Sequence, residues 1–320
     1  MLNIHKITVL GSGIMGHGIA QSFAAKGFQV SGFDELDSVR NTVKERIRAN
    51  IHSAVTVGFG DKSSIDSILS NFRICESEAE ALQDSDFVVE AVKEDLEIKQ
   101  ELFGRIEPLV SRNTIIASNT SSFPITQLSA HLHFPDRTIV THWFNPPHIV
   151  PVIEVVPGRK TSLFTIDRTL DLLKKAGKSP VHLKKEIPGF LINRIQIAML
   201  REILDLLNSG VADASEIDRA VKGSIGLRLA AIGPLEVIDF AGLETTGKVF
   251  QNLVGDIKSD QELPAILKEK IDSGHFGVKT GNGIYKYTDE LINEKIARRD
   301  HCFLELLKLL YEGETDLVND

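Results

Sequence analysis

The segment KITVLGSGIMG, residues 6–16, indicates the fold class most directly. Its apolar, β-branched beginning favours a buried strand, and three glycines with the spacing G-x-G-x-x-G then lead into a helical pattern. Gly11 permits a tight turn, Gly13 lets a pyrophosphate approach the backbone, and Gly16 lets the helix pack closely on the sheet. The free N–H groups at the start of that helix favour phosphates, so the stretch predicts a dinucleotide site.

An acidic residue stands where such a site needs one. Asp34 ends the next β-rich run, Gln29–Phe33, roughly 20 residues after Gly13, where a carboxylate can bind the ribose hydroxyls of adenosine. Glu35 follows directly, and two neighbouring carboxylates would repel a ribose 2′-phosphate. We therefore predict NAD rather than NADP as the cofactor.

The rest of the chain divides at Ile187-Pro188-Gly189. Before this break β-rich runs alternate with helical patterns, which is typical of a parallel sheet covered by helices; after it, long amphipathic helices replace the strands. We predict a Rossmann-type, doubly wound, mainly parallel α/β domain over residues 1–187 and an all-α domain over residues 188–320. The expected strands are Ile7–Leu10, Gln29–Phe33, Phe72–Cys75, Phe87–Glu90, Thr114–Ala117, Thr138–His142 and Val152–Val156, and the longer expected helices include Gly16–Lys26, Leu36–Val55, Phe190–Ser209 and Leu235–Val254.

Composition narrows the class of protein. A chain of 320 residues with 42% hydrophobic residues can form two globular domains, and a net charge of −8 without a dense Lys/Arg tract argues against nucleic acid as a partner. The two cysteines, Cys75 and Cys302, form no CxxC, so we expect neither structural zinc nor a disulfide framework. No signal peptide or membrane-spanning run is visible, and we expect a cytoplasmic protein that binds neither membrane nor metal.

A second informative segment is THWFNPPHIVPVIEVV, residues 141–156. Two β-rich runs, Arg137–His142 and Val152–Val156, flank a proline-rich turn, as in a hairpin. If the runs pair antiparallel about the middle of the turn, His142 lies opposite Glu154, with Cβ atoms about 5 Å apart. An imidazole held by a carboxylate is a general base suited to neutral pH. The alternative is an edge hairpin with an exposed His and Glu.

Two polar segments could complete such a site. Residues 118–122, SNTSS, follow the expected strand Thr114–Ala117 and so lie at the carboxyl end of the sheet, where ligands of this fold bind. Their alternative role is a helix cap before Pro124. Asn193, on the first long helix after the domain break, is either a surface residue or a donor that faces a cleft.

Together these motifs resemble the L-3-hydroxyacyl-CoA dehydrogenase family over essentially the whole chain. The resemblance implies reversible, NAD-dependent oxidation of the 3-hydroxyl group of an L-3-hydroxyacyl-CoA, such as 3-hydroxybutyryl-CoA, to a 3-keto group. It also implies a homodimer formed through the helical domain. The stretches that carry the resemblance are GSGIMGHGIAQ, VVEAVKEDLEIKQELF, ASNTSS, HWFNP followed by IEVV, PGFLINR, GPLEVIDFAGL and FGVKTGNGIYKY.

The resemblance implies roles for individual residues. His142 corresponds to the general base and Glu154 to its orienting partner. The groups near the reacting oxygen and the nicotinamide correspond to Ser121, Asn145 and Asn193. The implied cofactor contacts are Gly11, Gly13, Ile14, Met15, Gly16, Asp34, Glu94, Lys99, Ser121, Asn145 and Lys279.

Two departures from the acyl-CoA pattern concern the substrate. Residues 43–52, VKERIRANIH, carry mixed charge where the acyl-CoA enzymes have lysine-rich contacts to CoA. The pattern GLRLAAIGP, residues 226–234, resembles instead the L-gulonate 3-dehydrogenase (λ-crystallin) and carnitine dehydrogenase branches, and the turn after Asn145 resembles the gulonate branch. In those branches Arg228 would bind a free carboxylate, for which a guanidinium is the natural bidentate partner. Its alternative role is that of a surface residue before a turn.

Other segments favour the acyl-CoA branch. Asn119-Thr120-Ser121 and the run 239–246, DFAGLETT, are closer to the acyl-CoA pattern, which is the substrate class we predict. The λ-crystallin relationship also leaves open a non-catalytic, NAD-binding structural protein. The presence of both His142 and Glu154 argues against that alternative.

Overall fold

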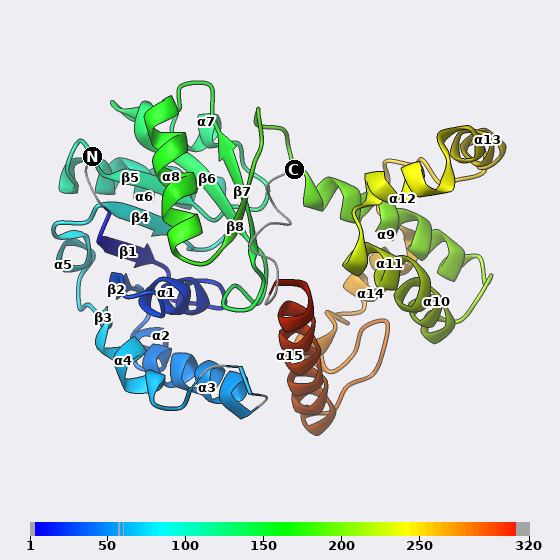
Figure 1. Cartoon of the computed structure of the whole chain (residues 1–320), viewed down its shortest axis with the longest axis horizontal. Coiled ribbons are helices and arrows are strands. Elements are labelled where there is room, and N and C mark those ends of the chain that lie inside the picture. The colour runs from blue at the N-terminus through cyan, green and yellow to red at the C-terminus, as the bar shows by residue number, and fades with distance from the viewer. Residues whose placement is uncertain (1–3, 57, 60, 312–320) are drawn as a thin grey trace. The chain divides into compact units, whose positions relative to one another are not determined.

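The structure, a computed structural model, describes residues 4–56, 58–59 and 61–311 (Figure 1). The chain forms two compact units, Met1–Asn193 and Arg194–Asp320, which we call unit 1 and unit 2. Residues 1–3 of the predicted α/β domain and residues 312–320 of the predicted helical domain lie outside the described residues.

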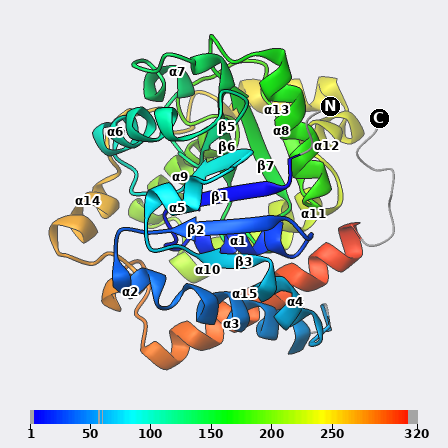
Figure 2. The ribbon, with the colours of Figure 1, turned by 90° about the vertical axis from the view of Figure 1, so that its left-hand side faces the viewer.

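Unit 1 is built on an eight-stranded sheet with the strand order β3-β2-β1-β4-β5-β6-β7-β8 (Figure 1), and Figure 2 shows β1, β2 and β3 side by side in it. Neighbouring strands are parallel except β6 and β7, which form an antiparallel hairpin. The order 3-2-1-4-5-6 is that of the doubly wound dinucleotide-binding fold, so the predicted fold class is confirmed. The strands are β1 (Lys6–Leu10), β2 (Gln29–Phe33), β3 (Phe72–Ile74), β4 (Phe87–Glu90), β5 (Ile115–Ser118), β6 (Thr138–Trp143), β7 (Val152–Pro157) and β8 (Ser179–His182).

Strand β8 was not predicted from the sequence, because it contains Pro180. It pairs with β7 alone and forms one edge of the sheet. A proline is tolerated on an edge strand, where its missing N–H leaves no ladder bond unmade.

The helices of unit 1 follow the sequence pattern with two differences. The helix expected over residues 36–55 is interrupted between α2 and α3, and the helices α4, α7 and α8 were not expected. Side chains of Ser77, Asp95 and Ser162 accept hydrogen bonds from backbone N–H groups in the first turns of α5, α6 and α8, which fixes where these helices begin. The helices are α1 (Gly16–Ala24), α2 (Asp37–Arg40), α3 (Val43–Thr56), α4 (Ser64–Ser70), α5 (Glu78–Leu82), α6 (Leu96–Ile106), α7 (Ile125–Leu128) and α8 (Leu163–Lys175), with 3-10 turns η1 (Glu107–Leu109) and η2 (Pro135–Arg137).

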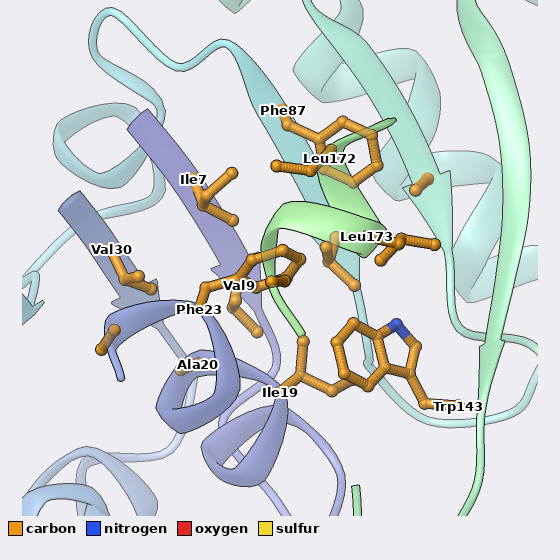
Figure 3. Close-up of a cluster of buried hydrophobic side chains, with 14 of the residues drawn as sticks. Ile7, Val9, Ile19, Ala20, Phe23, Val30, Phe87, Trp143, Leu172 and Leu173 are labelled. Atoms are coloured by element: carbon orange, nitrogen blue, oxygen red, sulfur yellow. The ribbon is translucent and has the colours of Figure 1, made fainter. Parts of the chain in front are cut away.

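The sheet separates two apolar cores. Successive strand residues point to opposite faces, so Val9 belongs to one core and Leu10 to the other. The first core packs Phe23 of α1 and Leu173 of α8 against Trp143 at the end of β6, with the Phe23 and Trp143 ring centroids 5.5 Å apart (Figure 3). In the second core, α6 and α7 pack against the other face of the sheet.

The regular elements of unit 2 are helices, and its described residues contain isolated β-bridges but no strands, so the predicted all-α class of this part is confirmed. The helix expected over residues 235–254 is broken at Gly242, whose φ of +86° favours glycine. No helix in the described part of the chain has the length and apolar character needed to cross a membrane. The elements are α9 (Ile192–Asn208, which begins in unit 1), α10 (Ala214–Val221), the π-turn η3 (Lys222–Gly226), α11 (Leu227–Ala231), α12 (Pro234–Ala241), α13 (Leu243–Leu253), α14 (Ala265–Asp272), the 3-10 turn η4 (Val278–Thr280) and α15 (Asp289–Tyr311).

Candidate active site

The three glycines of the turn between β1 and α1 differ in how much space a side chain would have. Gly11 has a φ of +88°, and a Cβ there would lie 2.5 Å from the carbonyl oxygen of Ala91. A Cβ on Gly16 would lie 1.7 Å from the carbonyl oxygen of Gly11. A Cβ on Gly13, by contrast, would meet no atom within 4 Å. The backbone at Gly13 is therefore open to an approaching group, and the helix N-terminus beside it suits the pyrophosphate of NAD.

Asp34 is fixed against this turn. Its carboxylate accepts hydrogen bonds from the backbone N–H groups of Ser12 (2.7 Å) and Leu36 (3.0 Å). Below the turn, the Arg46 guanidinium donates to the carbonyl oxygens of Ser12 (2.7 Å) and Gly13 (3.1 Å). Arg46 could not be predicted from the sequence, because a single arginine in the mixed-charge helix α3 has the pattern of a surface residue.

His142 and Glu154 face each other across the β6–β7 hairpin. Their Cα positions are paired in the ladder, and His142 Nδ1 lies 2.7 Å from Glu154 Oε2. His142 is 5% exposed and Glu154 has no exposed surface. The hairpin therefore has the register expected from the sequence, and both side chains are buried rather than on an exposed edge.

The environment of Glu154 favours its ionised form. Its second carboxylate oxygen accepts from the backbone N–H groups of Leu191 and Ile192, each at 2.9 Å, at the start of α9. Burial alone would raise the pKa of Glu154, but the hydrogen bonds from His142 and from these two amides outweigh it and lower the pKa. Because the ionised carboxylate can only accept, His142 Nδ1 is the donor, and Nε2 keeps a lone pair for a proton.

Two aromatic rings enclose the imidazole. The ring centroids of Phe144 and Phe190 lie 4.6 Å and 5.6 Å from that of His142. Phe190 is fully buried and has a φ of +51°, in the left-handed region that non-glycine residues rarely adopt. This conformation immediately precedes the two amides that bind Glu154.

Ser121 and Asn193 are brought together with Glu94. Asn193 Nδ2 donates to the carbonyl oxygen of Ser121 at 3.0 Å. One Glu94 oxygen accepts from Ser121 N (2.9 Å) and Oγ (3.2 Å), and also from the Thr120 and Ser122 hydroxyls at 2.7 and 2.8 Å. Burial would raise the pKa of Glu94, but the Thr120 hydroxyl and the other donors, with the nearby lysine charge, lower it. Glu94 thus holds the whole loop after β5.

That lysine is Lys99, which lies inside the protein. Its side chain is 1% exposed, and its ammonium lies 2.5 Å from Glu90 and 3.2 Å from Glu94. Glu90, fully buried, also accepts from the Ser118 hydroxyl at 2.5 Å and from the Val92 N–H at 2.8 Å. Burial raises the pKa of Glu90 in spite of Lys99. The contact that the resemblance implies between Lys99 and NAD stays a prediction; here Lys99 connects two carboxylates.

Some of these groups line a cavity of about 440 Å³, whereas Glu154, Lys99 and Asn193 are not in its lining. It lies at the carboxyl ends of β4, β5 and β6, beside the glycine turn, as ligand sites of this fold do. Asn119 also lines the cavity, and its side-chain oxygen accepts a hydrogen bond from the backbone N–H of Trp143 at 2.9 Å. The predicted site residues in its lining are Ile14, Met15, Glu94, Ser121, His142 and Asn145.

Two predicted residues lie in unit 2. Arg228 is on α11, where its Nε donates to the Ser224 carbonyl at 3.4 Å, and Lys279 is on η4. Their implied contacts with substrate and cofactor stay predictions. The described residues contain no group of three or more His, Cys, Asp or Glu side chains placed to hold a metal ion.

Comparison with known proteins gives matches over both parts of the chain. The family model described as 3-hydroxyacyl-CoA dehydrogenase, NAD binding domain, matches residues 6–187, and the model for the C-terminal domain of the same family matches residues 189–287. The hydroxyacyl-coenzyme A dehydrogenase of Homo sapiens mitochondria is 33% identical over 292 residues, which cover 89% of this chain and 91% of that one. An L-carnitine dehydrogenase of Nocardiopsis dassonvillei is 30% identical over 318 residues, with 97% and 93% covered.

A third relative is more similar. The 5-formyl-3-hydroxy-2-methylpyridine 4-carboxylate 5-dehydrogenase of Mesorhizobium japonicum is 36% identical over 308 residues, 96% of this chain and 98% of that one. A solved structure of an enzyme of this activity, described as NAD⁺-dependent, matches with a TM-score of 0.90 at 33% identity, covering 98% of this chain and 100% of that one.

The Rossmann-type sheet, the glycine turn and these matches define an NAD-dependent oxidoreductase. More narrowly, the chain belongs to the 3-hydroxyacyl-CoA dehydrogenase family. The predicted family and cofactor are thereby confirmed.

Proposed function

We propose that this enzyme oxidises a hydroxyl group of a small-molecule substrate with His142 as the general base. The observation that carries the proposal is the buried His142–Glu154 pair in the wall of the cavity that also borders the glycine turn. The substrate hydroxyl proton goes to His142 Nε2, and Glu154 stabilises the resulting imidazolium. NAD held at the glycine turn and Asp34 would supply the acceptor for the hydride of the hydroxyl-bearing carbon. In the reverse direction protonated His142 donates to the carbonyl oxygen.

The contacts of Ser121 and Asn193 suggest how they contribute. The Ser121 hydroxyl is directed at Glu94, an acceptor, so toward the cavity it offers a lone pair. That lone pair can accept a hydrogen bond from the carboxamide N–H of the nicotinamide, whereas the oxygen of a ketone needs a donor. Asn193 uses one N–H on the Ser121 carbonyl and keeps its second N–H and its oxygen for a ligand. Asn193 is therefore the better candidate for the reacting oxygen.

The first candidate substrate is an L-3-hydroxyacyl-CoA, such as 3-hydroxybutyryl-CoA. It is supported by the family models that match both parts of the chain. The reaction would belong to fatty acid metabolism, with Asn193 near the 3-hydroxyl group and Ser121 near the nicotinamide.

A second candidate is a compact substrate with a free carboxylate. It is favoured by the similarity to the pyridine 4-carboxylate dehydrogenase and to L-carnitine dehydrogenase, together with Arg228 in the pattern GLRLAAIGP. A guanidinium can bind a carboxylate through two parallel hydrogen bonds. Arg228 would then carry the specificity of the enzyme.

A substrate panel tests the chemistry and separates the candidates. Initial rates of NADH formation are measured with 3-hydroxybutyryl-CoA, 3-hydroxybutyrate, L-gulonate, L-carnitine and hydroxymethyl or formyl pyridine carboxylates. Turnover of the CoA thioester alone supports the first candidate, and turnover of a free acid alone supports the second. No NADH from any of them would favour the alternative of a non-catalytic, NAD-binding protein of the λ-crystallin type.

Substitutions then assign the residues. His142→Ala is expected to lower kcat by about 10²–10⁴-fold while NADH binding persists, and His133→Ala, an exposed histidine elsewhere, is the control. Wild-type turnover in His142→Ala would contradict the base assignment. Arg228→Ala should raise KM strongly for a free acid and leave a CoA thioester nearly unaffected, with the exposed Arg219→Ala as the matched control in unit 2.

We further propose that the enzyme is a homodimer through unit 2. Only three apolar side chains in the described part of unit 2 are buried, whereas Leu235, Phe240, Leu243 and Phe250 are 64–80% exposed. An apolar surface of this kind on a soluble domain is typical of a protein interface. Sedimentation equilibrium of the wild type and of Phe240→Glu tests this, and a wild-type monomer would contradict it.

A cytoplasmic location is also part of the proposal. Both cysteines are free thiols, and Cys302 is exposed, which suits a reducing compartment. Fractionation of cells that produce the protein tests this.

A further inference from the structure

The turn of the catalytic hairpin, residues 144–151, rests on the nucleotide-binding helix α1. A Cβ on Gly18 of α1 would lie 2.7 Å from Pro147 Cγ and 3.1 Å from His148 Nδ1, so only glycine leaves room for the turn. The Ser22 hydroxyl, one helical turn later, lies 3.2 Å from the Pro147 carbonyl oxygen. The turn carries Asn145, which lines the cavity.

A lysine holds the same turn from the other side. Lys178 lies between α8 and β8, and its ammonium donates to the carbonyl oxygens of Pro147 at 2.7 Å and Val150 at 3.1 Å. It also lies 5.4 Å from the ring centroid of Trp143, the residue that follows His142. One cation thus contacts both arms of the turn and the end of the strand that carries the base.

This lysine has no charged partner to account for its position. It makes no ion pair with any carboxylate among the described residues, and burial, with the charge of Lys26, lowers its pKa to about 8. Lys178 is partly buried, and removing a cation from water is costly unless hydrogen bonds replace its hydration. Here those bonds come from the two carbonyls of the turn.

We infer that Lys178 is a positioning residue of the active site, which clamps the Pro147 and Val150 carbonyls and so fixes the turn beside His142. With Gly18 and Ser22 on the opposite side, it makes the nucleotide-binding helix and the base-bearing hairpin one rigid element. Displacement of the turn would move Phe144 away from the imidazole and Asn145 away from the cavity. The inference deepens the proposed function and rests on it for its kinetic part only.

The kinetic test compares Lys178→Met, which keeps the length and removes the donors, with Lys178→Arg, which keeps a cation with donors. Lys178→Met should lower kcat by about 10- to 100-fold, because small misplacements of reacting groups cost that much. KM for NAD⁺ should change much less, and Lys178→Arg should recover most of kcat. The control is Lys175→Met, an exposed lysine at the end of α8 that pairs with Asp171. Unchanged kcat in Lys178→Met would overturn the inference.

A second measurement does not depend on turnover. Trp143 is the single tryptophan of the chain and is 2% exposed, so its fluorescence reports on the clamp. In Lys178→Met, but not in Lys178→Arg or Lys175→Met, acrylamide should quench this emission more strongly. Unchanged quenching in Lys178→Met would overturn the clamp even if kcat fell. If the wild type turned over no substrate, the proposed function would fail while the quenching comparison still decided on the clamp.

Gly18→Ala provides a separate test of the contact between the turn and α1, which can be used if Lys178→Met does not fold. Alanine favours a helix over glycine, so the substitution should be harmless unless the turn really rests on α1. We expect it to reproduce the loss of kcat and the increased quenching. A Gly18→Ala enzyme with wild-type kcat and quenching would overturn the proposed role of the contact.

Discussion

Glu154 binds His142 Nδ1 with one carboxylate oxygen and the two amides that open α9 with the other. The same carboxylate therefore orients the imidazole and fixes the segment Leu191–Ile192. Each of the two oxygens therefore has its own partner, so that replacing the carboxylate with a carboxamide should alter the contact with His142.

Glu154→Gln should lower kcat/KM by about 10²–10⁴-fold with little change in NADH affinity. A carboxamide can present its N–H₂ to Nδ1, which selects the wrong imidazole tautomer and cannot stabilise the imidazolium. Steady-state kinetics with an NADH titration measures both effects. A kcat/KM within about twofold of the wild type would mean that the carboxylate does not act on the base.

The pH dependence of stability provides a second prediction. The pKa of Glu154 is held below its ordinary value of 4.5, so the native state binds its proton less readily than the unfolded chain. The stability this contributes is present above pH 4.5 and is lost as the pH falls through the lowered native value. Urea unfolding of wild type and Glu154→Gln between pH 3 and 7 should show their difference shrinking at the acid end. A difference that stays constant with pH would contradict this.

Two glycines of the nucleotide turn should respond in opposite ways. Gly16→Ala places a Cβ against the Gly11 carbonyl, so it should lower the melting temperature and NADH affinity together. Gly13→Ala has free space for its Cβ and should fold normally, yet lose NADH affinity because the methyl group occupies the pyrophosphate position. Calorimetry and fluorescence titration separate the two outcomes. Normal NADH binding by Gly13→Ala would place the pyrophosphate elsewhere.

The buried Lys99–Glu90 pair should be sensitive to the loss of one partner. Lys99→Met leaves Glu90 buried without its cation, which should cost about 3–5 kcal/mol of unfolding free energy. Adding Glu90→Gln should recover part of this cost. Denaturant unfolding of the single and double variants tests the coupling, and strictly additive effects would argue against a pair.

Much of this architecture could be predicted from local sequence. The glycine turn, Asp34 and the His142–Glu154 register follow from periodicity and spacing, because each depends on residues that are close along the chain or paired in one hairpin. Neither Glu90 nor Lys178 could be found this way. Their roles depend on carbonyls and carboxylates brought near by packing, and each has the sequence pattern of an ordinary strand end or surface lysine.

Edge strand β8 and the break at Gly242 were missed for a related reason. A proline argues against a strand unless the strand is known to be at an edge, which is a property of the whole sheet. A glycine within an apolar helical pattern does not reveal the sign of its φ.

The antiparallel hairpin in an otherwise parallel sheet has a consequence for how the enzyme can change. A parallel pair would need a long crossover, whereas here base and carboxylate are only 12 residues apart and share a single turn. The neighbours of Glu154 in β7 are Ile153 and Val155, whose side chains face the opposite side of the sheet. Inserting or deleting one residue in the turn would therefore slip an apolar side chain into the place of the carboxylate. The turn can therefore tolerate substitutions, but not an insertion or deletion of one residue.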